Sequence, residues 1–387
     1  MRRKSKSSKR TPVGIELFCG CGGLSTGFLD EGVRIAAGFD VDRRAIEAYE
    51  YNHSYRGSKG VVADLGGKSG SQLLEMAGVS KIDLLVGGPP CQPFSIVGKR
   101  RGLSDERADM VFHFLRYCRE LRPEAVLFEN VPNLARIDDG NLLAKLGAEL
   151  RRIDYEVATR VVLAADFGVP QYRRRLILVA LRGQEFKFPD PTHGQDSMLG
   201  RNLMPHVGAR AAIGDLPDAG YFGECGVYNH EPTEHTADML LRLSRLEPGC
   251  RERGSFHDRL HPDRPSFTLR AGTGNFSPLR PIHYKFDRVI TVRESARLQG
   301  FGDQFIWPDW IPRLQQYRQV GNAVPPPLAA TLARSLLRQL GWRRDKARLH
   351  GKPELRAPAI TMTDDERRAL RRSRIRGASL GGKGRRT

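Results

Sequence analysis

The feature that most constrains the fold is a regular alternation of short apolar segments and helical stretches between Val13 and about Leu181. Short apolar runs separated by amphipathic stretches are typical of parallel strands buried on both faces. The sequence therefore predicts an α/β fold with helices on both sides of a parallel sheet. The expected strands are 13–18, 34–39, 60–63, 82–86, 124–128, 156–163 and 175–181, and the expected helices are 24–31, 43–51, 107–121 and 141–152.

The alternation stops at about Gly183. From there to Arg288, Pro, Gly and His residues and short mixed segments predict a smaller, irregular domain. Helical patterning returns at 292–300 and 327–340. The expected organisation is a basic arm (1–10), an α/β domain (11–183), the irregular domain (184–287), a segment that returns to the first domain (288–342) and a basic, disordered tail (343–387).

The net charge of +19 is concentrated at the two ends of the chain. Residues 1–10 carry +6 and residues 341–387 carry +10, which leaves only +3 for residues 11–340. Basic arms of this kind can bind phosphates without reading bases. A solvated tail that only improves solubility has the same composition, so charge alone leaves both interpretations open.

Composition argues against two other classes of protein. No apolar run approaches the length of a membrane span, and the basic start is not followed by an apolar signal core, so we expect a cytoplasmic protein. The six cysteines show no paired CxxC spacing, and the His and Cys residues between 225 and 261 do not fit a zinc spacing. We therefore expect neither a disulfide framework nor a metal site.

One cysteine stands out because it follows the predicted strand 82–86 on a Pro-Pro turn. Ligands of open α/β sheets bind beyond the carboxyl ends of the strands, so Cys91 is a candidate nucleophile. A buried packing cysteine is the alternative. The flanking prolines and the polar Gln92 and Ser95 favour the exposed turn.

The first predicted strand leads into a glycine-rich turn, residues 19–23, where a ligand can approach the backbone. Asp40 ends the second strand and Asp64 follows the third, where carboxylates can bind ribose hydroxyls or cap helices. The turn lacks the full GxGxxG form, and no GxxxxGK is present. These residues therefore predict a cofactor that has a nucleoside but no phosphate chain.

Six blocks of sequence resemble motifs of the cytosine-5 DNA methyltransferases, chiefly those of bacterial restriction and modification systems. They follow in the order of that family and span residues 13 to about 340: Ile15–Leu24, Gly88–Ser95, Glu129–Val131, Gln171–Leu176, Arg293–Phe301 and Gly321–Pro327. The resemblance implies a Rossmann-like S-adenosylmethionine-dependent methyltransferase sheet in residues 11–183. It also implies a target-recognition domain at 184–287 and a hinge segment at 288–342.

The implied reaction is sequence-specific transfer of a methyl group from S-adenosylmethionine to C5 of a flipped-out cytosine in double-stranded DNA. By resemblance, the thiolate of Cys91 adds to C6 of the base, and Glu129 hydrogen-bonds N3. Arg173 and Arg175 would hold O2 of the base and a nearby phosphate or carboxylate. As alternating residues of a strand, these two arginines should point one way and Arg174 the other.

The resemblance also implies residues that bind the cofactor and the DNA. Phe18 and Val41 would sandwich the adenine, and the implied cofactor residues are Phe18, Gly20, Gly22, Gly23, Leu24, Asp40, Val41, Asp64, Pro90, Asn322 and Val324. The segment 94–107 resembles a closing catalytic loop, and 270–276 offers groups for base edges. The implied DNA contacts are Gln92, Ser95, Lys99, Arg100, Arg101, Arg107, Arg270, Thr273 and Asn275.

Two other functions remain open from the sequence. An RNA cytosine-5 methyltransferase would share Cys91 and Glu129, and a catalytically inactive DNA-binding regulator would be expected to lack one of them. The long variable segment and the basic arms favour duplex DNA. For the main interpretation we expect a monomer associated with the nucleoid, with a cognate restriction endonuclease as a possible partner.

Overall fold

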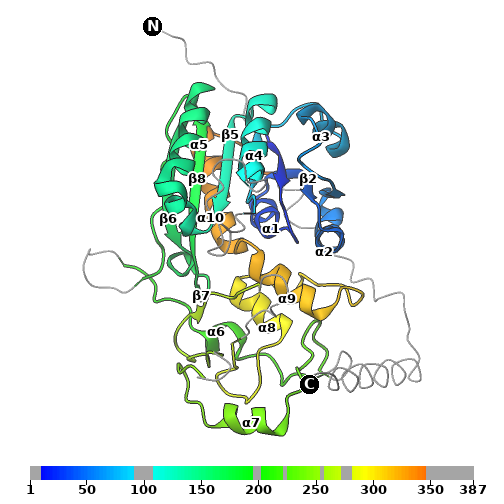
Figure 1. Ribbon diagram of the computed structural model, residues 1–387, viewed down its shortest axis with the longest axis vertical. Coiled ribbons are helices and arrows are strands. Elements are labelled where there is room, and N and C mark those ends of the chain that lie inside the picture. The colour runs from blue at the N-terminus through cyan, green and yellow to red at the C-terminus, as the bar shows by residue number, and fades with distance from the viewer. Residues whose placement is uncertain are drawn as a thin grey trace, which may run out of the picture. The chain divides into compact units, whose positions relative to one another are not determined.

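A computed structural model describes residues 10–90, 108–194, 202–220, 225–252, 257–271 and 281–345 (Figure 1). Within these ranges, an α/β part is built on one large sheet. The described residues between 202 and 322 form what we call the second region, which is mostly irregular. No helix in the described ranges is long and apolar enough to cross a membrane.

The large sheet has seven strands in the order β3-β2-β1-β4-β5-β8-β6. Neighbouring strands from β3 to β5 run parallel, whereas β8 runs antiparallel to both β5 and β6. The predicted fold class is confirmed, with the difference that β8 interrupts the parallel arrangement. The strands are β1 (Val13–Leu17), β2 (Arg34–Asp40), β3 (Lys59–Val62), β4 (Leu84–Gly87), β5 (Ala125–Asn130), β6 (Tyr155–Leu163) and β8 (Arg174–Arg182), with β7 (Gln171–Tyr172) and β9 (Ser266–Phe267) paired separately.

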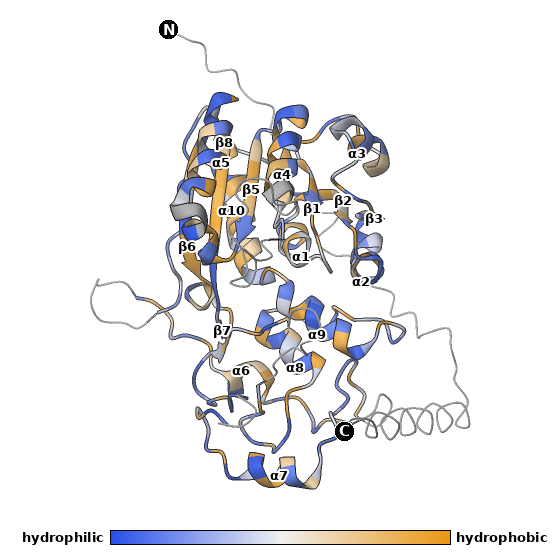
Figure 2. Cartoon of the chain, viewed as in Figure 1, coloured by the Kyte–Doolittle hydropathy of each residue, from blue (hydrophilic) through white to orange (hydrophobic). Residues whose placement is uncertain are grey.

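Helices cover both faces of the sheet, as the apolar strands require (Figure 2). One buried apolar cluster lies between the sheet and helices α3, α4 and α5, and another lies between the sheet and helices α1 and α10. The helices are α1 (Gly23–Asp30), α2 (Arg43–His53), α3 (Gly70–Ala77), α4 (Ala108–Leu121), α5 (Asn141–Arg152), α6 (Ala209–Ile213), α7 (Ala237–Ser244), α8 (Val292–Gln299), α9 (Arg313–Asn322) and α10 (Pro326–Leu340).

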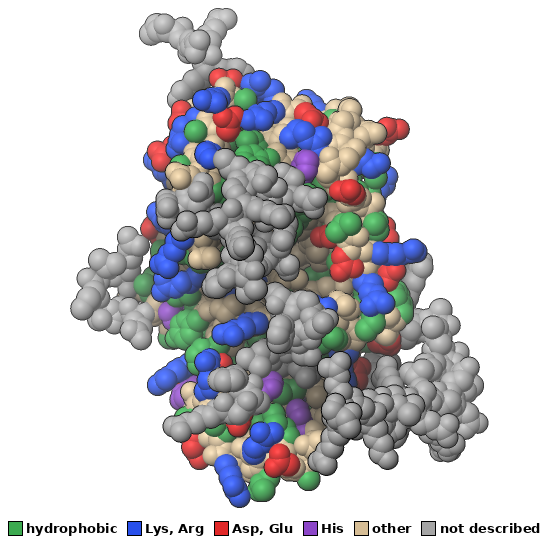
Figure 3. Space-filling view, viewed as in Figure 1, with side chains coloured by type: hydrophobic (Ala, Val, Ile, Leu, Met, Phe, Trp, Pro, Cys, Tyr) green, Lys and Arg blue, Asp and Glu red, His purple; other side chains and the backbone are tan. Residues whose placement is uncertain are grey.

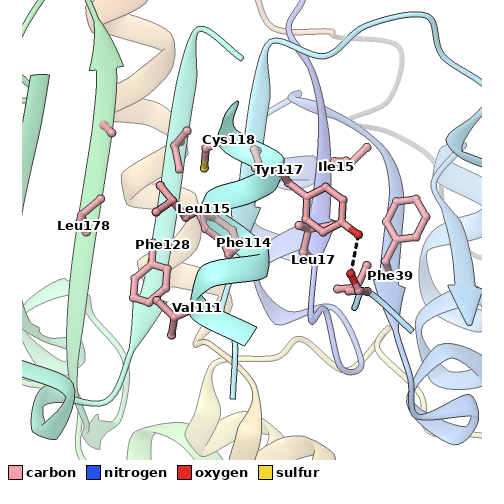
Figure 4. Close-up of a cluster of buried hydrophobic side chains, with 14 of the residues drawn as sticks. Ile15, Leu17, Phe39, Val111, Phe114, Leu115, Tyr117, Cys118, Phe128 and Leu178 are labelled. Atoms are coloured by element: carbon pink, nitrogen blue, oxygen red, sulfur yellow. Dashed lines mark hydrogen bonds between the residues drawn. The ribbon is translucent and has the colours of Figure 1, made fainter. Parts of the chain in front are cut away.

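Figure 4 shows the first of these clusters, where α4 packs on the strands. Phe114 of α4 meets Phe128 of β5 edge to face, with ring centroids 5.5 Å apart. Tyr117 of the same helix buries its ring and donates its hydroxyl to the carbonyl oxygen of Leu65 at 2.7 Å. The helix therefore fixes both the sheet and the loop that follows β3.

The second region has its own apolar cluster, which includes Trp307, and an unusual share of buried polar groups. Arg288 pairs with Glu294 through two hydrogen bonds of 2.9 Å. Glu294 also belongs to a capping box with Thr291 at the start of α8. Because a buried charge is costly unless it is paired, these partners are as necessary here as apolar contacts are in the sheet.

The last described segment of the chain, which includes α10, packs against the α/β part. Helix α10 packs on α1, and a Cβ atom on Gly27 would lie only 2.4 Å from the carbonyl oxygen of Pro326. A Cβ atom on Gly23 would lie 2.3 Å from that of Val324. Both glycines are therefore needed for the close approach of α1 to α10 and to the residues just before it.

Both ends of the described chain lie at the amino edge of the sheet. Arg10 pairs with Asp83, directly before β4, at 2.6 Å. The amide of Arg343 donates to the carbonyl oxygen of Arg10 at 3.0 Å, and Trp342 donates its indole N–H to Glu124 at 3.2 Å. This edge is opposite to the one where the strands end.

Candidate active site

The carboxyl ends of β1 and β4 are the focus of the candidate site, because the strand order reverses there. The two strands pair in register, with Leu17 opposite Gly87. A crevice forms where neighbouring parallel strands are connected in opposite directions. The glycine-rich turn follows β1 at this edge, and the turn leading to Cys91 follows β4.

The glycine-rich turn depends on left-handed backbone conformations. Phe18, Gly20 and Gly22 have φ values of 57°, 54° and 92°. A Cβ atom on Gly20 would meet no atom within 4 Å, whereas one on Gly22 would lie 2.5 Å from the ring of His53. Gly22 therefore packs into the protein, and Gly20 borders open space that a ligand can enter.

Acidic groups at the ends of β2 and β3 flank this turn. Asp40 accepts the amide of Gly20 at 2.8 Å through one carboxylate oxygen and that of Asp42 at 2.9 Å through the other. Burial raises the pKa of Asp40, which these backbone hydrogen bonds oppose. Asp64 is exposed and accepts the amide of Gly66 at 2.9 Å, and Val41 is 72% exposed. The strand ends thus offer acceptors and one small apolar face.

A buried polar chain beneath the turn was not predicted from the sequence. Glu16 of β1 accepts the amide of Ser25 at 2.9 Å and is also hydrogen-bonded to its hydroxyl. Ser25 contacts the hydroxyl of Tyr49 at 2.8 Å. Burial raises the pKa of Glu16 to about 8 despite these bonds. The chain ties β1, α1 and α2 together around the turn.

The predicted cofactor residues of the last segment lie beside the same turn. Asn322 is exposed at the end of α9, and Val324 is buried against Gly23. Leu24 is also buried, in the cluster between the sheet and α10. The structure thus brings chain positions about three hundred residues apart to one place.

Glu129, near the end of β5, lies directly beside the turn that leads to Cys91. A Cβ atom on Gly88 would lie 2.8 Å from a carboxylate oxygen of Glu129. Asn130, which sequence reasoning left out of the site, donates its side-chain amide to the carbonyl oxygen of Pro89 at 2.9 Å. Pro90, next in the chain, is exposed. The motif Glu129–Val131 could have indicated Asn130, because Glu129 and Asn130 are the last two residues of β5.

Glu129 forms an ion pair with Arg175 of β8, with 2.7 Å between Nε and the carboxylate. Glu129 is 7% exposed. Burial raises its pKa, which the positive charges of Arg175 and Arg173 partly oppose. A carboxyl group with a raised pKa is suited to carry a proton to or from a ligand near neutral pH.

Arg173 occupies a different place from Arg175. It is 1% exposed, and its guanidinium donates to the carbonyl oxygens of Leu269, Gly321 and Ala323 at 3.3, 2.7 and 3.2 Å. Arg174 between them is exposed. The side chain of Arg173 is therefore engaged with the backbone, while that of Arg175 faces the carboxylate.

A hollow of about 480 Å³ opens next to this ion pair. Its walls come from β6, β7, β8 and the segments after β5 and β9, and they are formed by Pro132, Leu163, Tyr172, Arg174, Arg175 and Thr268. In the space-filling view, Lys and Arg side chains lie along this side of the molecule near β6 and β7 (Figure 3). Arg270, exposed, follows Thr268 by two positions.

The predicted nucleophile and eight of the nine predicted DNA contacts lie outside the described residues. Arg270 is the exception and is described as exposed. The others are Cys91, Gln92, Ser95, Lys99, Arg100, Arg101, Arg107, Thr273 and Asn275. Their predicted roles remain predictions.

The arrangement fits a nucleoside-bearing cofactor. Open space borders Gly20, acceptors lie at Asp40 and Asp64, and the turn has no form that would seat a pyrophosphate. Together with the carboxyl group of Glu129, these features fit an α/β methyltransferase.

The comparisons with known proteins agree. The model of the family "C-5 cytosine-specific DNA methylase" matches residues 13–338. Type II methyltransferase M.XorII of Xanthomonas oryzae pv. oryzae is 34% identical over 388 residues, covering 87% of each chain. Type II methyltransferase M1.HphI of Haemophilus parahaemolyticus is 32% identical over 340 residues, covering 84% of this chain and 86% of the relative.

A solved structure shares the fold as well. It is of a protein assigned as a DNA modification methyltransferase within an E. coli prophage, with a TM-score of 0.69, 26% identity and coverage of 86% of this chain and 100% of that one. The chain belongs to the C-5 cytosine-specific DNA methylase family. It is an S-adenosylmethionine-dependent DNA (cytosine-5) methyltransferase, which favours the main interpretation over an RNA enzyme or an inactive regulator.

Proposed function

We propose that the thiolate of Cys91 adds to C6 of a cytosine that has been flipped out of duplex DNA. The observation that carries this proposal is the contact of Gly88 and Pro89 with Glu129 and Asn130. The turn that bears Cys91 therefore starts beside a carboxyl group whose pKa burial raises. Nucleophile and acid would then reach the same pyrimidine ring.

Glu129 acts as the acid that serves N3. When sulfur bonds to C6, the electrons of the C5–C6 double bond and of the ring shift toward N3 and O2. A proton from Glu129 neutralises N3, and Arg175 lies where it can stabilise the carboxylate that results. Unassisted C5 is a poor nucleophile, so this addition is what activates it.

The remaining steps require S-adenosylmethionine and a base. S-adenosylmethionine, when bound, supplies an electrophilic methyl group. C5 of the adduct bonds to that methyl group as the bond between the methyl group and sulfur breaks, which leaves S-adenosylhomocysteine. The C5 proton is then removed by a base. The electrons of the C5–H bond re-form the C5–C6 double bond as the thiolate leaves C6. N3 returns its proton to Glu129, which gives 5-methylcytosine and restores the acid.

We assign cofactor binding to the residues around the glycine-rich turn. Asp40 and Asp64 bind the ribose hydroxyls, and Phe18 and Val41 bind the two faces of the adenine. Gly20, Gly22, Gly23 and Leu24 shape the turn, and Pro90, Asn322 and Val324 complete the site. Val41 is a small partner for an adenine face, so we expect most of the stacking to come from Phe18.

We assign DNA binding to two segments. Residues 92–107, with Gln92, Ser95, Lys99, Arg100, Arg101 and Arg107, would contact the DNA around the flipped base. The target-recognition domain, 184–287, would read the sequence with Arg270, Thr273 and Asn275 among its contacts. Flipping costs on the order of a few kcal/mol, which contacts of this kind offset.

We further propose a place in a restriction–modification system, since several relatives are named type II methyltransferases. A cognate endonuclease would cut the same site when it is unmethylated. The enzyme would act as a cytoplasmic, nucleoid-associated monomer. Each catalytic event modifies one cytosine, so one active site, and therefore one copy of the protein, is sufficient.

DNA that contains 5-fluorocytosine at the target position tests the covalent step. Fluorine at C5 cannot leave as a cation, so the final elimination is blocked and the adduct should persist through denaturing electrophoresis and map to Cys91 by mass spectrometry. Bisulfite sequencing of DNA from cells that express the protein identifies the target for this duplex.

Cys250→Ala, which changes an exposed cysteine, is the matched control and should trap as well as the wild type. Cys91→Ala should bind S-adenosylhomocysteine but trap nothing. Absence of a wild-type adduct, or an adduct that persists in Cys91→Ala, would refute the proposed mechanism.

A further inference from the structure

Three buried polar side chains lie between the α/β part and the second region. Gln171 and Gln299 are 0% exposed and Arg173 is 1% exposed. They come from the segment before β8 and from the end of α8. We call them the polar cluster. Gln171 donates to the side-chain oxygen of Gln299 at 2.7 Å and to the carbonyl oxygen of Leu298 at 3.2 Å.

The polar cluster holds the backbone just before a proposed DNA contact. Gln171 accepts the amide of Leu269 at 3.1 Å, and Arg173 donates to the carbonyl oxygen of the same residue at 3.3 Å. Both backbone groups of Leu269 are therefore fixed by the cluster. Arg270, the next residue, is exposed.

The same cluster holds the backbone on both sides of a proposed cofactor contact. Arg173 donates to the carbonyl oxygens of Gly321 and Ala323, and Gln299 donates to that of Ala323. Asn322 lies between these two anchored carbonyls and is exposed. Burial lowers the pKa of Arg173, so its charge needs the three carbonyl partners that surround it.

The two held segments also touch each other directly. A Cβ atom on Gly321 would lie 2.8 Å from the amide nitrogen of Ala271 and 3.0 Å from the carbonyl carbon of Arg270. Real Cβ atoms do not approach backbone this closely, so a shift of either segment displaces the other. The polar cluster and this contact make one rigid unit of residues 269–271 and 321–323.

We propose that Arg173, Gln171 and Gln299 are positioning residues shared by DNA binding and cofactor binding. They act through Leu269 on Arg270 and through Gly321 and Ala323 on Asn322. Arg173 therefore supports the site from behind and does not contact the base O2 that the sequence resemblance implied for it. The proposal rests on the assignments of Arg270 and Asn322 made above.

The test compares two separate affinities in the full-length protein. Calorimetry without DNA gives the Kd of S-adenosylhomocysteine, and fluorescence anisotropy without cofactor gives the Kd of a duplex that carries the site found by bisulfite sequencing. Gln299→Leu keeps the volume but removes both polar groups. We expect it to weaken both affinities by about fivefold or more, the effect of roughly one lost hydrogen bond.

Arg173→Lys and Arg173→Met test whether both affinities depend on the hydrogen bonds of this side chain. Lysine keeps the charge and can reach some of the carbonyls, so Arg173→Lys should recover part of both affinities that Arg173→Met loses. If Arg173→Met does not fold, Gln299→Leu and Arg173→Lys still decide the question. Both Kd values refer to folded protein, so a loss of stability alone would leave them unchanged.

Asn322→Ala and Arg270→Ala are the matched controls. Asn322→Ala should weaken only the cofactor and Arg270→Ala only the DNA, whereas Gln299→Leu should weaken both. A folded Gln299→Leu protein with either affinity unchanged overturns the shared role. If instead the two controls fail to affect their own ligands, the assignments of Asn322 and Arg270 in the proposed function are wrong.

Discussion

The α/β part and the second region are stabilised in different ways. Apolar clusters on both faces hold the sheet, with Leu17, Phe114 and Phe128 fully buried. The second region buries Trp307 as well, but it also depends on paired charges such as Arg288 and Glu294. Apolar contacts tolerate many partners, whereas a buried charge needs one particular partner. The comparison suggests a permissive scaffold beside a region whose arrangement is set by specific pairs.

The largest expected effect tests whether the chemistry belongs to the α/β part alone. Glu129→Gln removes the proton donor and should lower the rate of methyl transfer by roughly 10²–10⁴-fold, the usual contribution of a general acid. Its affinity for DNA should stay close to that of the wild type. Single-turnover transfer of labelled methyl groups measures the first quantity and anisotropy the second.

Glu124→Gln is the control, since Glu124 lies before the amino end of the same strand and pairs with Arg10. It should leave the rate unchanged. A Glu129→Gln enzyme that keeps the wild-type rate would remove the proposed acid from the mechanism.

The next effect tests how the second region is held. Glu294→Ala leaves Arg288 buried without its main partner and should lower the free energy of unfolding by about 3–5 kcal/mol. Replacing both residues together, as Arg288→Met with Glu294→Leu, should recover most of that loss. Urea denaturation followed by tryptophan fluorescence and circular dichroism measures both variants.

A comparable loss is expected in the sheet from Phe128→Ala, about 3–5 kcal/mol, because it leaves a cavity. Phe128 is apolar, so no second replacement that removes a charge can compensate for this loss. If the double replacement in the second region is as unstable as Glu294→Ala, specific charge pairing is not what sets this region apart.

Single buried groups of the two regions should respond to pH with opposite sign, as Glu16 of the sheet and His283 of the second region do. His53 of α2, whose pKa burial lowers to about 3, acts in the same direction as His283. Burial raises the pKa of Glu16 to about 8, so the folded sheet binds a proton that the unfolded chain releases above its ordinary value of 4.5. This contribution is fully present below pH 4.5 and is lost as the pH rises to about 8. Burial also raises the pKa of Glu129, which acts in the same direction.

In the second region, burial lowers the pKa of His283 to about 4. Burial acts to raise the pKa of Glu294, but its hydrogen bonds with Arg288 outweigh this and lower it overall. Both contributions are present at neutral pH, and they are lost as the pH falls below about 6.5 for His283 and below about 4.5 for Glu294.

Hydrogen exchange, corrected for intrinsic rates, measures each region separately. Protection of β1 should fall between pH 5 and 8.5, and protection of α8 should fall between pH 7 and 4. Glu16→Gln should flatten the first profile and leave the second. Parallel profiles in the wild type would show that the two regions respond as one.

The smallest effect concerns the basic tail. Removing residues 346–387 deletes a large part of the net positive charge but keeps Arg344, which pairs with Glu31, and Asp345, whose amide donates to Gly32. The salt dependence of non-specific DNA binding should become less steep, while the rate of methyl transfer stays the same. Titration with an unrelated duplex at several salt concentrations measures how steeply the affinity falls with salt. If truncation leaves this salt dependence unchanged, the tail does not contact phosphates.

Much of the sheet followed from the sequence because its periodicity is strong. Helices α1, α2, α4, α5, α8 and α10 and all seven strands of the large sheet were predicted close to their observed positions. The direction of β8 was not, since an apolar strand has the same pattern in either direction. Helix α9 was missed because Gln316 and Gln319 occupy its buried face, held by the backbone of Ile311 and the indole of Trp307.

Contacts within the site could be predicted where both side chains belong to recognised motifs. They could not be predicted where a side chain is hydrogen-bonded to backbone atoms. The pairing of Glu129 with Arg175 joins two recognised motifs. The partners of Arg173 are carbonyl groups about one hundred to one hundred and fifty residues away, which no residue type reveals. Asn130 and Glu16 were missed for a related reason, because their roles depend on which loops the fold brings beside them.

The hydrogen bond between Arg343 and Arg10 has a practical consequence for protein engineering. A short linker from Asp345 to Arg10 would close the chain into a ring, which could be reopened at an exposed position such as Gly183. Circular permutants of this kind, or fusions to a programmable targeting module at the joined ends, would leave the methylating edge unobstructed on the far side of the sheet.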